Sequence, residues 1–386
     1  MRVMTKGRVD RGAWRSRVGR VLRWGVSAAL VVLGVAFTVA YVRSGNVCDQ
    51  GPLPTGPTPM AALVQCEYGG PDVLRMARIA RPSPGPGEVL VRVRAASVNP
   101  VDWHQMRGVP RVMRLSTGLR KPSDIRVGVD FAGIVAAVGP GVHSLAVGDA
   151  VFGMRNGALA EYVVVPTTRV VRKPDGVSFE AAAAAPLAAI TALQGLRDHG
   201  QVRRGQQVLV NGASGGVGTF AVQIARQLGA TVTGVCSTRN VAMVKGLGAQ
   251  RVIDYTRADV TRLPDRYDVI FDTVGNHALG AIRGVLAEGG RYVGIGGGTP
   301  HDAVWLGPLP RVLAMMLRSR VGSSTMTFFV TKANAADLDL VARWLSDGTL
   351  RTQIDRTLPF AQAAEAIRYL EQGRARGKVV VMMSAP

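Results

Sequence analysis

The chain is poor in cysteine, in histidine and in acidic residues. Its 386 residues include five histidines and only three cysteines, Cys48, Cys66 and Cys236. Three cysteines far apart in sequence cannot supply a four-cysteine zinc site, and we expect small buried residues with no disulfide framework. Asp and Glu number 26 against 47 Lys and Arg, a formal net charge of +21. This basic balance favours contact with an anionic membrane surface, because no motif for nucleic-acid binding accompanies it.

Internal repeats and low-complexity tracts are also lacking, apart from a proline-rich segment at 52–59. Hydrophobic residues make up 47% of the chain, and its length is ample for two domains with cores of their own. The sequence therefore predicts two globular domains preceded by an N-terminal extension.

The most informative segment is a short apolar strand followed by a glycine-rich turn and a helix. Residues 208–210 are apolar and mostly β-branched, as in a buried parallel strand, and apolar residues then recur at helical spacing up to Gly229. Glycines let the backbone approach a pyrophosphate closely, and a helix N-terminus favours the anion. The residues expected to bind a dinucleotide in this turn are Gly212, Ser214, Gly215, Gly216 and Val217.

The next strand, at 231–236, completes the βαβ spacing of a dinucleotide fold. At its end the chain has Ser237 and Arg239, where an NAD-binding protein would place Asp or Glu. A hydroxyl and an arginine suit the 2′-phosphate of NADP(H), so NADPH is the expected cofactor. The alternative interpretation leaves Arg239 as a solvated loop residue.

Further motifs follow one another from about residue 60 to the C-terminus. They are SVNPVDW (97–103), GVDFAGIV (128–135), VGPGV (138–142), VGDAVFG (147–153), GALAEY (157–162), YDVIFDTVG (267–275) and GRARGKVVV (373–381). With the glycine turn, they resemble the zinc-independent branch of the medium-chain dehydrogenase/reductase superfamily, of the quinone oxidoreductase or zeta-crystallin type. The resemblance implies an α/β protein: a β-rich GroES-like catalytic domain over 60–184, completed by 350–386, and a Rossmann doubly wound parallel sheet over 185–349.

Zinc-binding members of that superfamily take the metal from a cysteine and from a Gly-His-Glu segment. The matching positions hold Asn99, Val129 and Asp130, so we expect no metal site. Without a Lewis acid the substrate must itself be electrophilic, as quinones and activated alkenes or carbonyls are. Asn99 and Asp102 are the candidate catalytic residues, although Asn99 could instead brace a turn and Asp102 could pair with a basic side chain.

Other cofactor contacts are implied by position in the resembled family. Thr191 would lie against the nicotinamide, Tyr255 near the adenosine phosphate, and Lys378 would reach the phosphates from the closing segment. Gly294, Ile295 and Gly296 would present backbone to the nicotinamide amide. Homodimers are common in that family. Two alternatives to a quinone or enone reductase stay open: a non-catalytic NADPH-binding sensor or structural protein, and an alcohol dehydrogenase acting on simple alcohols.

The first 59 residues precede the resembled region. Residues 24–42 carry no charge and are long enough to cross a bilayer, which predicts a single transmembrane helix. A basic arm at 1–23 has eight basic residues and one acid, and a proline-rich linker follows at 43–59. The alternatives are a signal peptide cleaved after Ala40 and a true start at Met60.

Two arguments about membrane orientation disagree. The basic arm places the N-terminus in the cytoplasm and the enzyme outside, whereas NADPH is a cytoplasmic cofactor and favours a cytoplasmic enzyme. An apolar segment with arginines at 305–320 would suit a lipophilic substrate near the membrane, or alternatively a subunit interface or the core. The expected partners are thus a small electrophilic substrate, membrane lipid and a second subunit.

Overall fold

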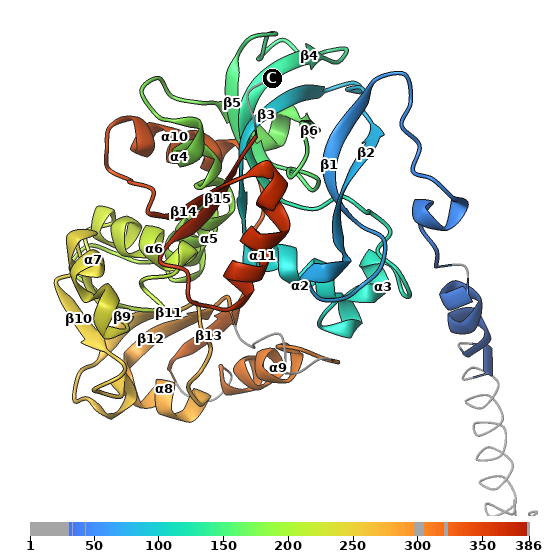
Figure 1. The fold of residues 1–386 in the computed structure, drawn as a ribbon. Helices are drawn as coiled ribbons and strands as arrows, with labels where there is room; N and C mark the ends of the chain where they lie inside the picture. The colour runs from blue at the N-terminus through green and yellow to red at the C-terminus, as the bar shows by residue number, and fades with distance from the viewer. Residues whose placement is uncertain (1–30, 33, 43, 297–304, 320–322, 384–386) are drawn as a thin grey trace, which may run out of the picture.

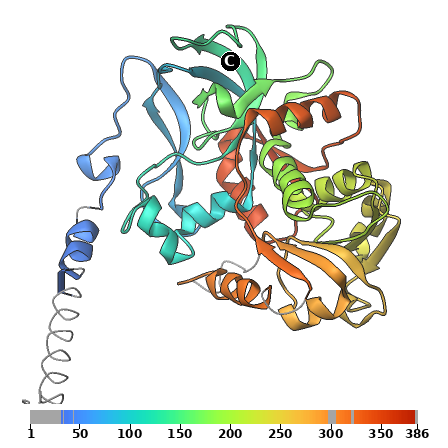
Figure 2. The same ribbon diagram turned by 180° about the vertical axis from the view of Figure 1, so that it is seen from behind.

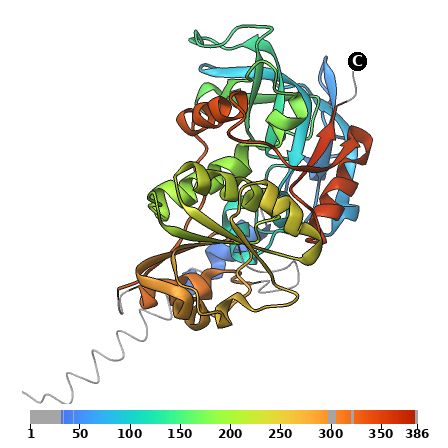
Figure 3. The same cartoon turned by 90° about the vertical axis from the view of Figure 1, so that its left-hand side faces the viewer.

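The computed structural model describes residues 31–32, 34–42, 44–296, 305–319 and 323–383 (Figure 1). Two large sheets dominate this part of the chain, one of six strands and one of seven, and a two-stranded sheet stands beside the larger one. Figure 3 shows the six-stranded sheet below the seven-stranded sheet. This arrangement agrees with the expected α/β class, with a Rossmann-type and a GroES-like part.

The six-stranded sheet is parallel throughout, and its helices lie on both faces. Residues of its central strands are buried almost without interruption, because parallel sheets are covered on both sides. In spatial order its strands are β10 (Arg251–Asp254), β9 (Thr231–Cys236), β8 (Gln207–Asn211), β11 (Tyr267–Asp272), β12 (Leu286–Gly294) and β13 (Thr325–Phe328).

The seven-stranded sheet joins the first part of the chain to its end. Its strands, in spatial order, are β14 (Ile354–Pro359), β15 (Lys378–Met382), β3 (Glu88–Val98), β4 (Asp130–Val138), β5 (Ala150–Met154) and β7 (Val170–Arg172), with β6 (Tyr162–Pro166) paired to β3. β1 (Pro59–Gln65) and β2 (Leu74–Ala80) form the two-stranded sheet. Because β15 pairs with β3, the closing segment of the chain lies inside the catalytic sheet and beside the six-stranded sheet's helices.

The helices that matter for the site begin where the strands end. α2 (Pro100–Arg107) follows β3, α5 (Pro186–Gln194) connects the two sheets, and α6 (Gly216–Gln227) follows the glycine turn after β8. The other helices are α3 (Arg114–Thr117), α4 (Phe179–Ala183), α7 (Val241–Gly246), α8 (Leu279–Val285), α9 (Leu309–Arg318), α10 (Ala335–Ser346) and α11 (Ala363–Glu371). α6 buries most of one side against the sheet, as its helical apolar spacing predicts.

The predicted transmembrane helix falls partly on residues outside the described ones. Residues 31–32 and 34–42 are helical and exposed, and this helix points away from the two sheets (Figures 1 and 2). Among the described residues, no helix has the length and apolar character that crossing a membrane requires.

The segment that follows this helix is bound to the catalytic domain, and one of its contacts corrects the expectation for the cysteines. Cys48 and Cys66 form a disulfide across 18 residues, so the prediction of unpaired cysteines was wrong for these two. Asn46 brings them together, since its side-chain amide donates to the carbonyls of Cys66 and Pro122 at 2.8 and 3.1 Å. The first part of the predicted proline-rich linker is therefore fastened to the domain at Asn46 and Cys48.

Candidate active site

The glycine turn has the shape expected of a pyrophosphate-binding loop. Gly212 adopts a φ of +82°, and a Cβ there would lie 2.2 Å from Oγ1 of Thr273. A Cβ on Gly218 would lie 2.1 Å from the carbonyl oxygen of Gly212, so the first turn of α6 packs directly on the loop backbone. These two positions accept only glycine. The N–H groups that open α6 have no partner within the helix, and they present an anion-binding end.

At the adenosine end, the two predicted residues Ser214 and Ser237 both accept hydrogen bonds from Asn240, which was not predicted from the sequence. The buried Asn240 donates through Nδ2 to Oγ of Ser214 at 3.1 Å and to Oγ of Ser237 at 3.2 Å. The glycine turn and the end of β9 are thereby held together. Asn240 carries no signal of its own in the sequence beyond its place just after Ser237.

Arg239 and Tyr255 lie at the exposed edge of the same region. The Arg239 guanidinium donates to the carbonyl oxygen of Arg374 at 2.8 Å, so it reaches across to the closing segment of the catalytic domain. Tyr255 is 61% exposed, and its N–H donates to the Cys236 carbonyl at the end of β9. The nearby Asp254 carboxylate is held by the hydroxyls of Thr238 and Thr256.

A buried aspartate ties the carboxyl ends of three neighbouring strands together. Asp272 Oδ1 accepts from Asn211 at 2.8 Å and from two backbone N–H groups of the following turn at 2.9 Å. Its Oδ2 accepts from the hydroxyl of Tyr292 at 2.8 Å, and that hydroxyl accepts from Arg311 on α9 at 3.0 Å. Burial, with the neighbouring Asp272 charge, raises the pKa of Tyr292, so it stays a donor. The site edge of this sheet is therefore rigid.

The residues predicted at the nicotinamide end lie on two segments, the end of β12 with the residues after it and the helix α5. The Ile295 N–H donates to the Asp272 carbonyl, and a Cβ on Gly296 would lie 2.1 Å from the Thr273 carbonyl oxygen, while Gly294 ends β12. Thr191 lies within α5, 6% exposed, and its hydroxyl donates to the Leu187 carbonyl and contacts the Thr331 hydroxyl, each at 2.6 Å.

Lys378 and the two candidate catalytic residues form a buried polar cluster with Asp130. Asn99 Nδ2 donates to Asp130 at 2.9 Å, and Asn99 Oδ1 accepts from the Lys378 ammonium. The Lys378 nitrogen lies 3.6 Å from Asp130 Oδ2. Asp102 Oδ2 accepts from the Asn99 N–H at 2.7 Å at the start of α2. All four side chains are at most 2% exposed.

This cluster differs from the expectation for Lys378 in one respect. Its aliphatic stem packs on the glycine turn, where a Cβ on Gly216 would lie 3.0 Å from Lys378 Cδ. Its ammonium, however, points inward to Asn99 and the Val98 carbonyl, and a backbone bridge joins Gly377 to Gly215. The residue therefore links the catalytic sheet to the turn through its stem, since the buried ion pair holds its charge.

Burial governs the charge states in the cluster. It raises the pKa of Asp102 to about 7, and the neighbouring Asp130 adds to the rise. Burial also raises the pKa of Asp130 against the opposing effect of Lys378, and it lowers the pKa of Lys378. In the part of the chain that the structure describes, Asp102 Oδ1 has no hydrogen-bond partner. A protonated Asp102 beside a Lys378–Asp130 ion pair is one arrangement that leaves no net charge buried.

The positions that hold zinc ligands elsewhere in the superfamily do not suit a cation here. Asn99 Oδ1 already accepts from an ammonium, which would repel a divalent metal. Within the described residues, no three His, Cys, Asp or Glu side chains are grouped so that they could hold a metal ion.

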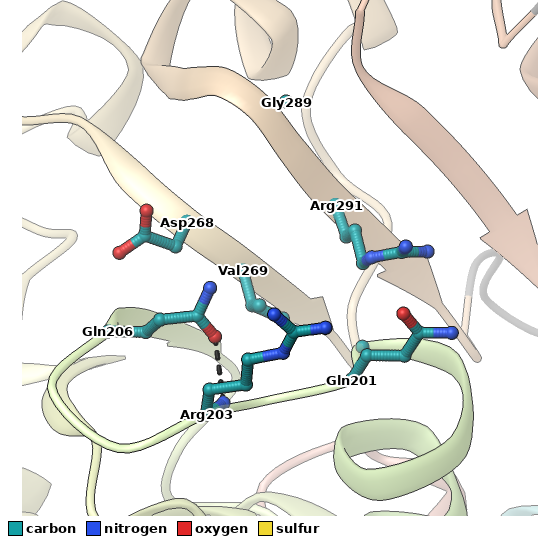
Figure 4. Close-up of a pocket in the computed structure, with 8 residues that line it drawn as sticks. Gln201, Arg203, Gln206, Asp268, Val269, Gly289 and Arg291 are labelled. Atoms are coloured by element: carbon teal, nitrogen blue, oxygen red, sulfur yellow. Dashed lines mark hydrogen bonds between the residues drawn. The ribbon is translucent and has the colours of Figure 1, made fainter.

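A cavity of about 200 Å³ lies at the opposite edge of the six-stranded sheet (Figure 4). Dinucleotides bind outside the carboxyl ends of parallel strands, and this cavity lies near the amino-terminal ends of β8 and β11. None of the predicted cofactor residues belongs to it. It is lined by Gly200, Gln201, Arg203, Gln206, Asp268, Val269, Gly289 and Arg291.

Comparison with known proteins identifies the family. Residues 85–175 match the alcohol dehydrogenase GroES-like domain, and residues 247–381 match a family described as zinc-binding dehydrogenase. The chain is 35% identical to 2-methylene-furan-3-one reductase of Solanum lycopersicum over 340 residues, which covers 84% of this chain and 79% of the relative. The chain belongs to the medium-chain dehydrogenase/reductase superfamily. Its relatives there include quinone and enone oxidoreductases.

Two further proteins, one known by sequence and one by structure, are similar to this dehydrogenase/reductase. It is 33% identical to the chloroplastic NADPH-dependent alkenal/one oxidoreductase of Arabidopsis thaliana, over 84% of this chain and 80% of the relative. The solved quinone oxidoreductase of Coxiella burnetii superposes with a TM-score of 0.74 at 29% identity, covering 85% of this chain and all of that one. The protein is an oxidoreductase that binds NADP(H).

Proposed function

We propose that this dehydrogenase/reductase reduces quinones or activated alkenes and carbonyls with NADPH, without zinc. The observation that carries the proposal is the joining of Ser214 and Ser237 through Asn240, with Arg239 beside them, at the end of β9. The relatives named above, an alkenal/one oxidoreductase and a quinone oxidoreductase, support this substrate class.

The residues present fit the cofactor along the whole edge of the sheet. The glycine turn, Gly212 with Ser214, Gly215, Gly216 and Val217, would hold the pyrophosphate, and Ser237 with Arg239 would hold the 2′-phosphate. Tyr255 would cover the adenosine, and Thr191 with residues 294–296 would face the nicotinamide. NADPH bound there supplies a hydride to the substrate, and the protein's part is to orient both partners and exclude water.

Asn99 and Asp102 act in this proposal as positioning residues. Both are buried, and both are bonded to protein groups in the cluster. Through Lys378, the cluster fixes the distance between the catalytic sheet and the glycine turn, which sets how the nicotinamide meets the substrate. In this proposal the Lys378 ammonium is bonded to Asn99, at a position where other members of the superfamily bind zinc. No metal would therefore stabilise the negative charge that develops on the substrate. The substrate must stabilise that charge itself, as quinones and enones do.

We further propose that residues 24–42 attach the enzyme to a membrane. The sequence there is uncharged and apolar, and a basic arm precedes it. The basic arm and the Cys48–Cys66 disulfide both favour an enzyme outside the cytoplasm, opposite to the side expected from NADPH. Protease protection in sealed vesicles of defined orientation decides between the two sides.

The decisive experiment measures NADPH oxidation by the full chain in detergent. Quinones, enones, saturated ketones and, in the reverse direction, simple alcohols with NADP⁺ are compared. We expect turnover with quinones or enones and none with saturated ketones or alcohols. Binding of NADPH without turnover of any acceptor would identify a sensor or structural protein, and turnover of simple alcohols would identify an alcohol dehydrogenase. Sedimentation of the same preparation tests the homodimer.

A further inference from the structure

α9 presents its apolar side outward. Leu309, Leu313, Met316 and Leu317 follow helical spacing along one side, and each is between 46% and 58% exposed. The opposite side is held in place, because Met315 is buried and Arg311 donates to the Tyr292 hydroxyl and the His277 carbonyl. An ordinary surface helix turns its apolar side to the core. Here the helix is fixed with that side exposed.

The exposed apolar surface continues onto the segment after α2. Val112 N–H donates to the Trp305 carbonyl at 3.1 Å, and the Arg111 guanidinium lies 4.4 Å from the centre of the Trp305 ring. Leu115 on α3 and Trp305 are each 68% exposed. We call the exposed apolar residues of these two segments together the seating face. It comprises Met113, Leu115, Trp305, Leu306, Leu309, Leu313, Met316 and Leu317.

Basic residues border the seating face. Arg111, Arg120 and Arg318 are exposed there, and the segments 111–121 and 305–319 contain no acidic residue. Exposed apolar area with a rim of one charge sign marks an interaction surface, and an arginine rim complements anionic groups.

The apolar N-terminal segment leaves the protein beside this face. The Arg120 N–H donates to Oγ of Ser44 at 3.0 Å, directly after the helix that ends at Val42. Asn46 and the Cys48–Cys66 disulfide then fasten the chain to the domain. The helix and α9 both lie at the lower side of the molecule in Figures 1 and 2, and the β4–β5 loop lies at the opposite end.

We propose that the seating face rests on an anionic lipid bilayer. The enzyme is then held on the membrane in one orientation and does not rotate freely about its N-terminal segment. The inference rests on the membrane attachment proposed above and is independent of the redox chemistry. Aliphatic side chains would enter the interface while the three arginines meet lipid phosphates, as in interfacial amphipathic helices. The docked segment 44–50 leaves too little free chain for the domain to turn away.

The test uses the full chain in vesicles of anionic and zwitterionic lipid with brominated acyl chains, which quench fluorescence on contact. Leu313→Cys carries an environment-sensitive fluorophore. The control, Val147→Cys, is 64% exposed in the β4–β5 loop. The native cysteines do not interfere without reductant, because Cys236 is buried and the other two are bonded to each other. We expect at least threefold stronger quenching at position 313 than at position 147.

Each failure is distinguishable. Vesicle-bound protein with equal, weak quenching at both positions overturns the seating face alone, and so does cross-linking of Leu313→Cys between two copies. Protein that does not associate with vesicles at all contradicts the membrane attachment in the proposed function. A Leu313→Asp/Leu317→Asp variant should stay attached but lose the quenching of a label at Leu309→Cys. NADPH oxidation with a water-soluble quinone, measured on the same samples, reports the redox function separately.

Discussion

Lys378 and Asn99 meet inside the catalytic domain, ammonium to amide oxygen, with both side chains almost wholly buried. Lys378 comes from the last strand of the chain and Asn99 from the end of β3. The Lys378 stem also packs on Gly216, so this contact joins the catalytic domain to the turn that is predicted to bind the cofactor.

Arg239→Ala should reduce NADPH affinity by about 10- to 150-fold, about 1.5–3 kcal/mol, because a charge-assisted hydrogen bond to the 2′-phosphate is lost. NADH affinity should hardly change. Titration of both nucleotides by fluorescence checks the difference, with Arg266→Ala, an exposed arginine before β11, as control. Equal losses for the two nucleotides would contradict the assignment of Arg239.

Gly218→Ala should disrupt the cofactor loop, whereas Gly215→Ala should leave the fold intact. A Cβ at 218 would overlap the Gly212 carbonyl at 2.1 Å, but a Cβ at 215 would lie 3.4 Å from the same oxygen. We expect Gly218→Ala to lower the melting temperature and to abolish NADPH binding. A melting temperature for Gly218→Ala as high as that of Gly215→Ala would show that the loop is not packed as described.

Asp102→Asn should flatten the pH dependence of stability. The folded-state pKa of Asp102 is raised to about 7 from 3.8, so the folded state binds the proton more tightly than the unfolded state. This contribution is present below about pH 4 and is lost as the pH rises through about 7. Asparagine keeps an oxygen for the Asn99 N–H and does not titrate. Urea midpoints across this range should fall less with pH in the variant than in the wild type.

Tyr292→Phe should cost about 1–3 kcal/mol of unfolding free energy, because it removes the hydroxyl between Asp272 and Arg311. A double-mutant cycle with Arg311→Met checks this coupling by denaturant unfolding. If the two losses add fully, the hydroxyl does not connect α9 to the sheet.

Activity should survive prolonged treatment with a chelator, and elemental analysis should find no stoichiometric zinc. The reason is that an asparagine bonded to an ammonium stands at a zinc-ligand position of the family. Loss of activity that added zinc restores would overturn this expectation.

The fold class could be predicted from sequence because local signals carry it. The glycine turn between strand and helix depends on neighbouring residues alone, and the structure has β8, Gly212 and α6 in that order. The Cys48–Cys66 disulfide could not be predicted, since it depends on where Asn46 docks the chain on a loop far away in sequence.

The candidate site, like the fold, has residues that local sequence predicts and residues that depend on distant parts of the chain. The βαβ spacing predicts Ser214 and Ser237 as cofactor-binding residues, but Asn240, which bonds both, has no distinguishing pattern. The inward turn of the Lys378 ammonium could not be predicted from the closing motif, because it depends on Asn99 at the start of α2 and on Asp130 in β4. Long-range polar contacts of this kind are decided by tertiary packing, which one sequence does not display.

The position of β15 has a consequence for the order in which the chain can fold during synthesis. All six strands of the parallel sheet lie between residues 207 and 328, so that sheet can form before the ribosome has finished. β6 pairs with residues 88–92 on one edge of β3, but residues 95–98 on that edge must wait unpaired until residues 378–382 emerge. Such an edge is open to wrong pairing with other chains. The nascent protein therefore keeps an open strand edge until residues 378–382 emerge, and a variant that lacks residues 378–386 should leave that edge open permanently.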